Sequence, residues 1–199
     1  PVDSTGAALR DAAAGTTVDA TDNRWVCRID SGLATLWRLM SRTGFTFDTS
    51  SIPDTDTISA ATLSIFGSAT THNDQFNIAA NVYDFTPASE TLYVTGDYDQ
   101  FGTTAFSTAI DFSAWSTTAY NDFAFNASGL ADISKTGNTV VGVRDSNSDV
   151  PNTEPTWSSE VVGRIGYRSY LAAGTTNDPK LVITHAAAGG ANHWLLMGV

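Results

Sequence analysis

Residues 42–67, RTGFTFDTSSIPDTDTISAATLSIFG, constrain the fold more than any other stretch, because they are typical of two strands joined by a hard turn. In the first strand Phe45 and Phe47 are two residues apart, so both rings fall on one face. In the second strand, "TLSI" alternates apolar and polar residues, as a half-buried strand does. Between them Pro53 fixes its own φ and lacks an amide N–H, which favours a turn. The stretch predicts a β frame and contains no obvious reaction chemistry.

The rest of the chain continues the same pattern of short apolar runs between turn residues. Further strands are expected at 24–30, 33–40, 76–85, 105–112, 119–125, 138–145, 160–170, 179–185 and 191–199. The run at 33–40 would also tolerate a helix. "NASGLADISK" is the best helix, with Asn126 or Ser128 as its N-cap and Gly137 beyond its end. About ten strands and one short helix predict an all-β sandwich.

We divide the chain into three parts. Residues 1–22 are polar and rich in small residues, and we expect an N-terminal arm that gains order only against a neighbour. Residues 23–186 form the β-sandwich. Residues 187–199 form a C-terminal linker followed by an apolar strand.

A resemblance to a known family refines this prediction. "FDTSSIP" followed by "ISAATLSIFG" resembles the DNRLRE-type, disaggregatase-related jelly-roll modules, which share an aromatic–Asp pair, a Ser-Ser-Ile/Leu-Pro turn and an Ala-Thr-Leu strand. "GDYDQFGTT", "YNDFAFNASGLADISKTG" and "DPKLVITH" are similar to a variant of that module in phage structural proteins. The resemblance covers residues 42–185 and implies a jelly-roll topology, but it says little about function. Thr46 stands where many such modules place an arginine, so no role of that arginine is carried over.

Charge and cysteine content exclude several classes of function. A formal net charge of −11 offers no basic patch for nucleic acid or an anionic membrane. Cys27 is the only cysteine, so no intrachain disulfide and no thiolate metal site can form. No apolar run approaches the ~18 residues of a membrane-spanning helix. The start, PVDSTG, has no charged-then-apolar signal segment. If Pro1 is the native start, we expect a protein made in a cytoplasm, as virion proteins are; a processed or trimmed start would look the same.

The sequence also lacks the motifs of the common enzyme classes. His72, His185 and His193 do not have the spacing of a metal-binding pair, and we interpret them as turn or tail residues. There is no nucleophile elbow and no glycine-rich phosphate loop followed by lysine. Paired carboxylates lie in turn-rich loops, where aspartate is favoured for backbone reasons alone. We therefore expect no catalytic activity.

Two kinds of ligand site remain as hypotheses. Aromatic side chains near loops can stack on a sugar while staying wet. The candidate glycan-binding residues are Trp115, Tyr93, Tyr98, Tyr120 and Trp157. The alternative is that both tryptophans cap the open ends of the sandwich as core residues. Asp97 and Asp99 offer closely spaced oxygens for Ca²⁺, with structural Asx turns as the favoured alternative.

The C-terminal segment suggests assembly. Trp194, Leu195, Leu196 and Met197 form an apolar row that is unfavourable to leave in water. The row is either an ordinary last strand of the same sandwich or a contact with a neighbouring subunit. In the second case the protein is a homo-oligomer, and the phage resemblance implies a trimer.

We therefore expect a non-enzymatic phage virion surface protein: a capsid decoration, head-fibre or tail-associated module. It would act in particle assembly and contact glycans or a host surface. The alternative is a secreted, extracellular carbohydrate-binding module of a larger polysaccharide-degrading protein.

Overall fold

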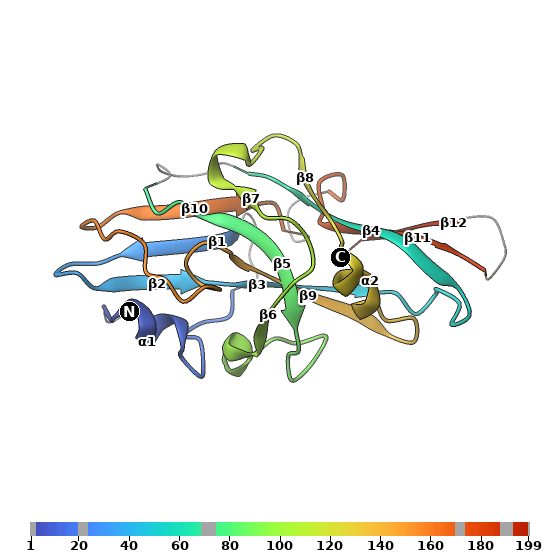
Figure 1. Ribbon diagram of the computed structural model, residues 1–199, viewed down its shortest axis with the longest axis horizontal. Coiled ribbons are helices and arrows are strands. Elements are labelled where there is room, and N and C mark those ends of the chain that lie inside the picture. Colours follow the sequence, from blue (N-terminus) through green and yellow to red (C-terminus); the bar gives the residue numbers. More distant parts are fainter. Residues whose placement is uncertain (1–2, 20–23, 69–74, 170–173, 188–192, 199) are drawn as a thin grey trace.

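The computed structural model describes residues 3–19, 24–68, 75–169, 174–187 and 193–198, and it confirms an all-β sandwich. Twelve strands lie within these residues, in three antiparallel sheets (Figure 1). The jelly-roll connectivity stays a prediction.

Each sheet is named after its most central long strand. The β1 sheet has the order β10 (Val162–Tyr167), β1 (Arg24–Ser31), β2 (Trp37–Ser41). The β4 sheet has the order β12 (His193–Gly198), β11 (Lys180–Ala186), β4 (Thr57–Phe66), β8 (Tyr120–Ala124). The β5 sheet has the order β3 (Thr43–Asp48), β9 (Asn138–Asp145), β5 (Ala79–Phe85), β6 (Phe101–Ala105), with β7 (Ile110–Asp111) also paired to β5.

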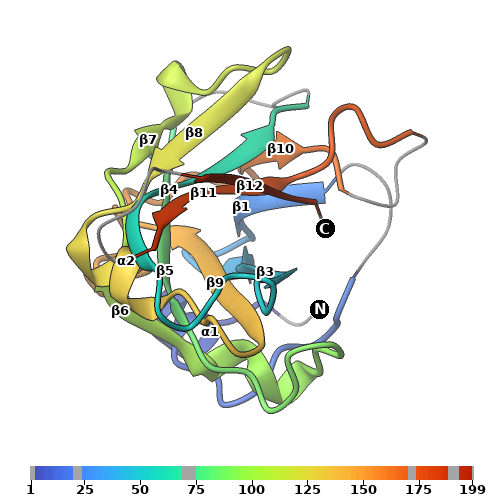
Figure 2. The same cartoon turned by 90° about the vertical axis from the view of Figure 1, so that its right-hand side faces the viewer.

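The three sheets form two layers. The β1 and β4 sheets are joined where β4 ends, because Arg168 N donates to Phe66 O at 3.0 Å and Ser68 N donates to Gly166 O at 3.0 Å. The β5 sheet forms the other layer, and Figure 2 shows the β4 sheet above it. Strands β2 and β3 are separated only by Arg42, so the chain crosses from the β1 sheet to the β5 sheet at that residue.

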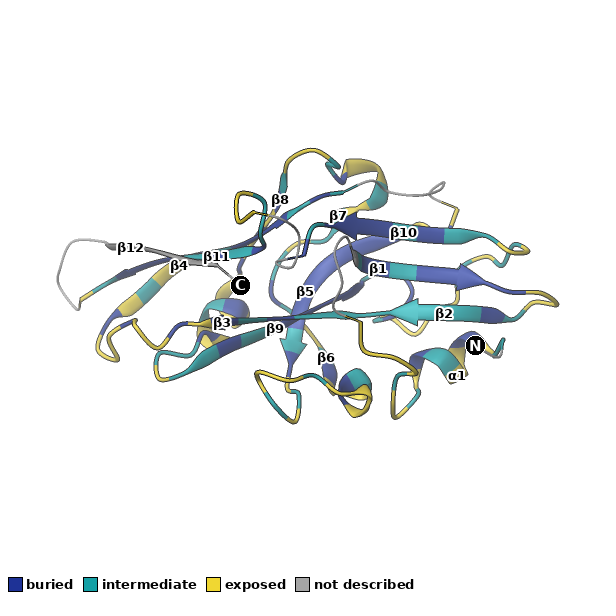
Figure 3. Cartoon of the chain, turned by 180° about the vertical axis from the view of Figure 1, so that it is seen from behind, coloured by how far each residue is buried: buried dark blue, intermediate teal, exposed yellow. Residues whose placement is uncertain are grey.

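The core lies between the layers. In β4, Leu63 and Ile65 are buried in it and Thr62 is half-buried, as the pleat requires, although Ser64 is buried as well. The central strand β5 is buried along nearly its whole length. Figure 3 shows this burial concentrated along the strands, with exposure at the loops. The largest fully buried side chains are Phe47, Phe76, Phe123, Ile29, Ile52, Leu63, Ile65, Ile78, Ile165, Leu181, Ile183 and Val26.

The stretch 42–67 forms the two predicted strands, β3 and β4, but they belong to different layers. The turn between them therefore spans the end of the sandwich and does not close a hairpin. Ile52 from the turn is buried in the core, and Thr49 Oγ1 lies 2.8 Å from Thr139 Oγ1 on β9. The apolar residue of the Ser-Ser-Ile-Pro turn thus closes one end of the core.

Two predicted strands differ in detail. The β1 register shifts between Trp25 and Cys27, which is a bulge, and the bulge buries Val26 as well as Cys27. Strict alternation along the strand would place Val26 on the face opposite Cys27. The ambiguous run 33–40 is a turn followed by β2. Ala34 and Thr35 have φ of 54° and 64°, a left-handed conformation that neither a helix nor a strand continues.

The helices are short. The predicted helix is α2 (Ala127–Asp132), and Asn126 caps it, because its side chain accepts from Ser128 N at 2.9 Å and Gly129 N at 3.1 Å. The other helical elements are α1 (Gly6–Arg10) and the 3₁₀ turns η1 (Thr95–Gln100) and η2 (Phe112–Ala114). In the part of the chain that the structure describes, no helix has both the length and the apolar character needed to cross a membrane.

The described part of the N-terminal arm packs on its own chain. Ser4 N donates to Trp37 O at 2.8 Å and Trp37 N donates to Ser4 O at 2.7 Å, which adds a bridge to the edge of β2. Helix α1 follows at once and lies beside β2 (Figure 1). Residues 20–22 of the predicted arm lie outside the described residues.

Candidate functional site

Two hollows adjoin the loop between β9 and β10, residues 146–161, and share the segment around Glu154. The wider one, the Glu154 groove, has about 180 Å³ of space for water-sized molecules. It is lined by Gln75, Phe76, Asn77, Asn147, Ser148, Thr153, Glu154, Pro155 and Thr156. The narrower one, the Trp37 hollow, has about 10 Å³ of such space. It is lined by Gly6, Leu9, Arg10, Ile29, Trp37, Leu39, Met40, Ser148, Thr153, Glu154 and Pro155.

Asp145, the last residue of β9, organises the start of the loop. Its Oδ1 accepts from Ala79 N at 2.9 Å and Asn147 N at 3.3 Å, and its Oδ2 accepts from Ser148 N at 2.8 Å. Burial raises the pKa of Asp145, and these amide hydrogen bonds oppose that rise. The carboxylate supplies acceptors for amide groups that would otherwise be buried without partners.

Asp149 ties the loop to strand β9 and to the junction between β2 and β3 through buried ion pairs. It accepts from Arg42 Nε at 2.8 Å and Nη2 at 2.7 Å, and from Arg144 Nε at 2.9 Å and Nη2 at 2.8 Å. The Asp149 side chain is only 1% exposed. Burial alone would raise the pKa of Asp149, but the hydrogen bonds and charges of Arg144 and Arg42 outweigh it and lower that pKa. In the sequence, Asp145, Asp149 and Glu154 mark this loop only as acidic, and nothing local shows the two arginines.

The amide side of the groove is held in a fixed conformation. Asn147 Nδ2 donates to Asn77 O at 2.8 Å, which joins the loop to the segment before β5. Asn77 and Asn152 have φ of 49° and 60°. Asparagine tolerates this left-handed region better than most residues. No pattern in the sequence singled out these residues, because a polar loop residue looks the same whether or not it faces a groove.

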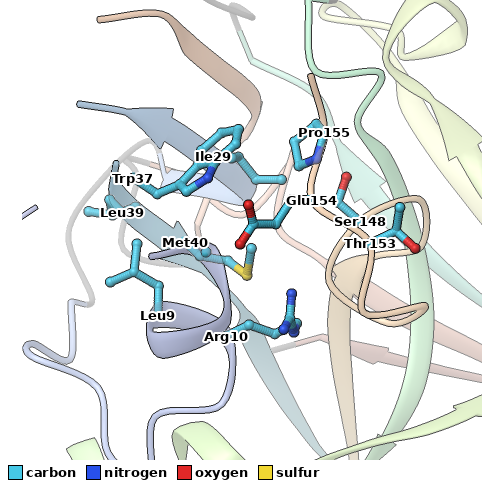
Figure 4. A pocket seen from close by; sticks show the side chains of 11 residues that line it. Leu9, Arg10, Ile29, Trp37, Leu39, Met40, Ser148, Thr153, Glu154 and Pro155 are labelled. Atoms are coloured by element: carbon cyan, nitrogen blue, oxygen red, sulfur yellow. The ribbon is translucent and has the colours of Figure 1, made fainter. Parts of the chain in front are cut away.

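The Trp37 hollow lies under α1 (Figure 4). Trp37 is 3% exposed, packs edge-on against Phe76 at 5.2 Å, and its Nε1 has no hydrogen-bond partner among the described protein atoms. In Figure 4 the Glu154 carboxylate reaches into the hollow between Trp37 and Met40. Glu154 Oε1 also accepts from Ala7 N at 3.2 Å, so this side chain links the loop to α1.

The two candidate tryptophans pack into the protein. Trp115 is 6% exposed, belongs to the core cluster and donates from Nε1 to Gly166 O at 3.1 Å. Its ring is therefore a core residue, as the alternative interpretation held, and no face of it is open for stacking. Trp157 is half-buried against the core and donates from Nε1 to Leu36 O at 2.9 Å.

The three candidate tyrosines are half-buried, each with its own neighbours. Tyr93 lies edge-on to Phe85, Tyr98 lies under the Arg42 guanidinium at 4.1 Å, and Lys180 Nζ lies 3.9 Å from the centre of the Tyr120 ring. Burial raises the pKa of both Tyr93 and Tyr98 to about 12. Among the described residues, no ring contact joins any two of the five aromatic candidates.

The two candidate calcium ligands do not share a site. Asp97 is 3% exposed, and its two oxygens accept from Ala88 N and Val94 N, both at 2.8 Å. Asp99 is exposed and accepts from Gln100 Nε2 at 2.6 Å. The Asp97 side chain thus closes the loop by accepting from backbone N–H groups of earlier residues, which is a structural role but not the Asx turn of the alternative interpretation. Within the described ranges, no group of three or more His, Cys, Asp or Glu side chains is placed to hold a metal ion.

One histidine has a partner that the sequence did not indicate. His185 Nδ1 lies 2.7 Å from Asp56 Oδ2, and both side chains are buried. The two residues are 129 positions apart, so no local motif could show the pair. His72 lies outside the described residues, and only the backbone of His193 is described.

The predicted assembly row lies in β12, the last strand of the β4 sheet. Trp194, Leu195, Leu196 and Met197 are registered opposite residues 184, 183, 182 and 181 of β11. The backbone therefore forms a strand of its own chain's sheet, as one alternative held, and a contact with a neighbouring subunit stays a prediction. Residues 191, 192 and 199 of the predicted strand lie outside the described residues.

Comparisons of the chain with protein-family models, curated proteins and solved structures returned no match.

Proposed function

We propose that this chain is a non-enzymatic phage virion surface protein, acting as a capsid decoration, head-fibre or tail-associated module. It assembles as a homo-oligomer, with a trimer as the expected form, and contacts other virion proteins. Its exposed loops attach the particle to glycans or to a host surface. The phage role comes from the sequence resemblance, and the assembly role is supported by the position of β12.

The single observation that carries assembly is the place of β12 at the end of a sheet. One edge of β12 pairs with β11, and no other strand among those the structure describes pairs with its second edge. An edge strand presents backbone N–H and C=O groups that can pair with a strand of another chain. A strand from a second copy of the chain would continue the β4 sheet across a subunit interface.

The test compares the full chain with a chain that ends at Ala187. We expect the full chain to sediment as an oligomer and the shortened chain to sediment as a monomer with a lower Tm. Asp99→Asn is the control, because Asp99 is exposed and lies in a different loop. Should the shortened chain not fold, the full chain alone decides the matter, since a monomer at every micromolar concentration would refute assembly through β12.

A second candidate is a secreted carbohydrate-binding module of a larger polysaccharide-degrading protein. The Glu154 groove favours it, because a groove lined by amide, hydroxyl and carboxylate groups suits a saccharide without any assembly. A monomer that binds a saccharide supports this second candidate. An oligomer that attaches to capsids or tails without sugar supports the first.

A further inference from the structure

We propose that the Glu154 groove binds one neutral saccharide unit. This inference rests on the attachment role proposed above and names the place and the chemistry of that attachment. The groove offers about 180 Å³ of space. That is less than the ~300 Å³ of the smallest drug-sized pockets, so it suits a single sugar ring and not an extended chain.

The walls of the groove present uncharged hydrogen-bonding groups. Asn77 is exposed, and no partner of its side-chain amide is found among the described residues. Asn147 uses Nδ2 to hold Asn77 O, which leaves its Oδ1 as an acceptor. Thr156 adds an exposed hydroxyl on the opposite segment. Sugar hydroxyls donate and accept at once, so a mixed set of amides and hydroxyls can satisfy them.

Glu154 adds the strongest acceptor and excludes one class of ligand. Its Oε1 accepts from Ala7 N, and no hydrogen bond to its Oε2 is found among the described residues. Because Glu154 lines both hollows, rotation of its carboxylate would bring Oε2 to a sugar hydroxyl at the boundary between them. A hydrogen bond to a carboxylate is roughly twice as strong as one between neutral groups. The same negative charge repels phosphates and uronates, and the net charge of −11 adds to that repulsion. These charges therefore exclude anionic sugars and leave neutral ones.

The groove also has apolar surface for the C–H groups of a sugar. Pro155 is half-buried and lines both hollows, and the buried Phe76, which packs against Trp37, also lines the groove. A ring that places hydroxyls toward the amides and C–H groups toward Pro155 would use both kinds of surface.

The loop that lines the groove with Asn147, Ser148 and Glu154 is held in a fixed conformation without a ligand. Asp145 fixes the amides of Asn147 and Ser148, and Asp149 fixes the loop to Arg144 on β9 and to Arg42 between β2 and β3. Thr153 N also donates to Ser148 O at 3.1 Å across the loop. A wall held by so many bonds does not need to be ordered on binding, which lowers the entropic cost of association.

The experiment is saturation-transfer NMR of the full chain with the methyl glycosides of glucose, galactose, mannose and N-acetylglucosamine. We expect at least one to bind with a millimolar Kd. Glu154→Gln keeps the shape of the side chain and an acceptor for Ala7 N but removes the charge. Asn77→Gly keeps the left-handed backbone and removes the amide. Each should weaken binding by about tenfold, whereas Asp99→Asn should leave Kd unchanged.

Three results would overturn the inference: no glycoside binds, binding persists unchanged in both groove variants, or spermidine binds to the groove while the glycosides do not. Circular dichroism and thermal melting of both variants show whether they fold. Oligomeric mass separates this inference from the proposed function. A monomer that binds a glycoside through the groove contradicts assembly and supports the groove, and an oligomer with an inert groove does the reverse.

Discussion

The buried carboxylate of Asp149 makes the sharpest prediction about stability. In Asp149→Asn the amide keeps one acceptor oxygen and turns an NH₂ group toward N–H donors. Each carboxylate oxygen accepts one bond from Arg42 and one from Arg144, so either orientation of the amide breaks one bond to each arginine. Two hydrogen bonds to charged groups are worth about 3–6 kcal/mol in total. Breaking a buried ion pair by removing one partner costs about 3–5 kcal/mol. We therefore expect the free energy of unfolding to fall by about 3–5 kcal/mol, the range that the two estimates share.

Urea unfolding followed by circular dichroism and tryptophan fluorescence measures this loss. For a domain of this size it corresponds to a fall in Tm of about 6–20 °C. Asp99→Asn makes the same chemical change on an exposed side chain and should alter the free energy of unfolding by less than about 0.5 kcal/mol. If Asp149→Asn does not fold, Arg42→Lys keeps the charge but loses the two-pronged contact, and should cost about 2 kcal/mol. A loss for Asp149→Asn within about 1 kcal/mol of the control would refute the reasoning.

Three further predictions follow from the same contacts. Because the folded pKa of Asp149 is lowered, its stabilising effect is complete above the unfolded value of about 3.9 and is lost as pH falls through the folded value; the stability gap between wild type and Asp149→Asn should therefore shrink below about pH 3.9 in urea titrations. Because the oxygens of Asp97 accept backbone N–H groups, millimolar Ca²⁺ or EDTA should leave Tm unchanged, and a rise with Ca²⁺ would show that the loop opens to bind it. Gly67→Ala places a Cβ against the carbonyl oxygen of Ser116 and should cost about 1–3 kcal/mol, whereas Gly96→Ala meets no atom within 4 Å and should unfold like wild type; equal urea midpoints would contradict this.

The frame of the fold could be predicted from the sequence because its signals are local. Strand β4 and the polar cap of α2 each need only a few neighbouring residues, and both are confirmed, although Ser64 of β4 is buried where strict alternation would expose it. The bulge at Trp25 could not be predicted, because it depends on how β1 meets β10, and a shift of one residue changes which side chains are buried. The same limit explains why β3 and β4 look like a hairpin in the sequence yet belong to different layers.

The candidate site was much harder to predict, since its parts come from distant positions. Tryptophan and tyrosine residues near loops led us to predict sugar stacking. Trp115 is instead buried in the core, because burying a large ring stabilises the fold more than leaving it in water. The groove is instead lined by amides and one carboxylate whose significance depends on which loop lies opposite. Arg42 shows the same difficulty: it lies 107 residues from Asp149.

The buried charges and the groove are parts of one arrangement. The loop after β9 has many amide groups that a core cannot satisfy, and the carboxylate oxygens of Asp145 accept from those of Asn147, Ser148 and Asp149. A buried carboxylate is itself costly, so Asp149 is stabilised by Arg42 and Arg144. Because β2, β9 and the loop are held together in this way, the segment that carries Ser148 and Glu154 is fixed relative to the sheet. Asp149→Asn should therefore weaken saccharide binding in the Glu154 groove, even though Asp149 does not line it. If this variant is less stable but binds the saccharide as tightly as wild type, the loop keeps its shape without those ion pairs.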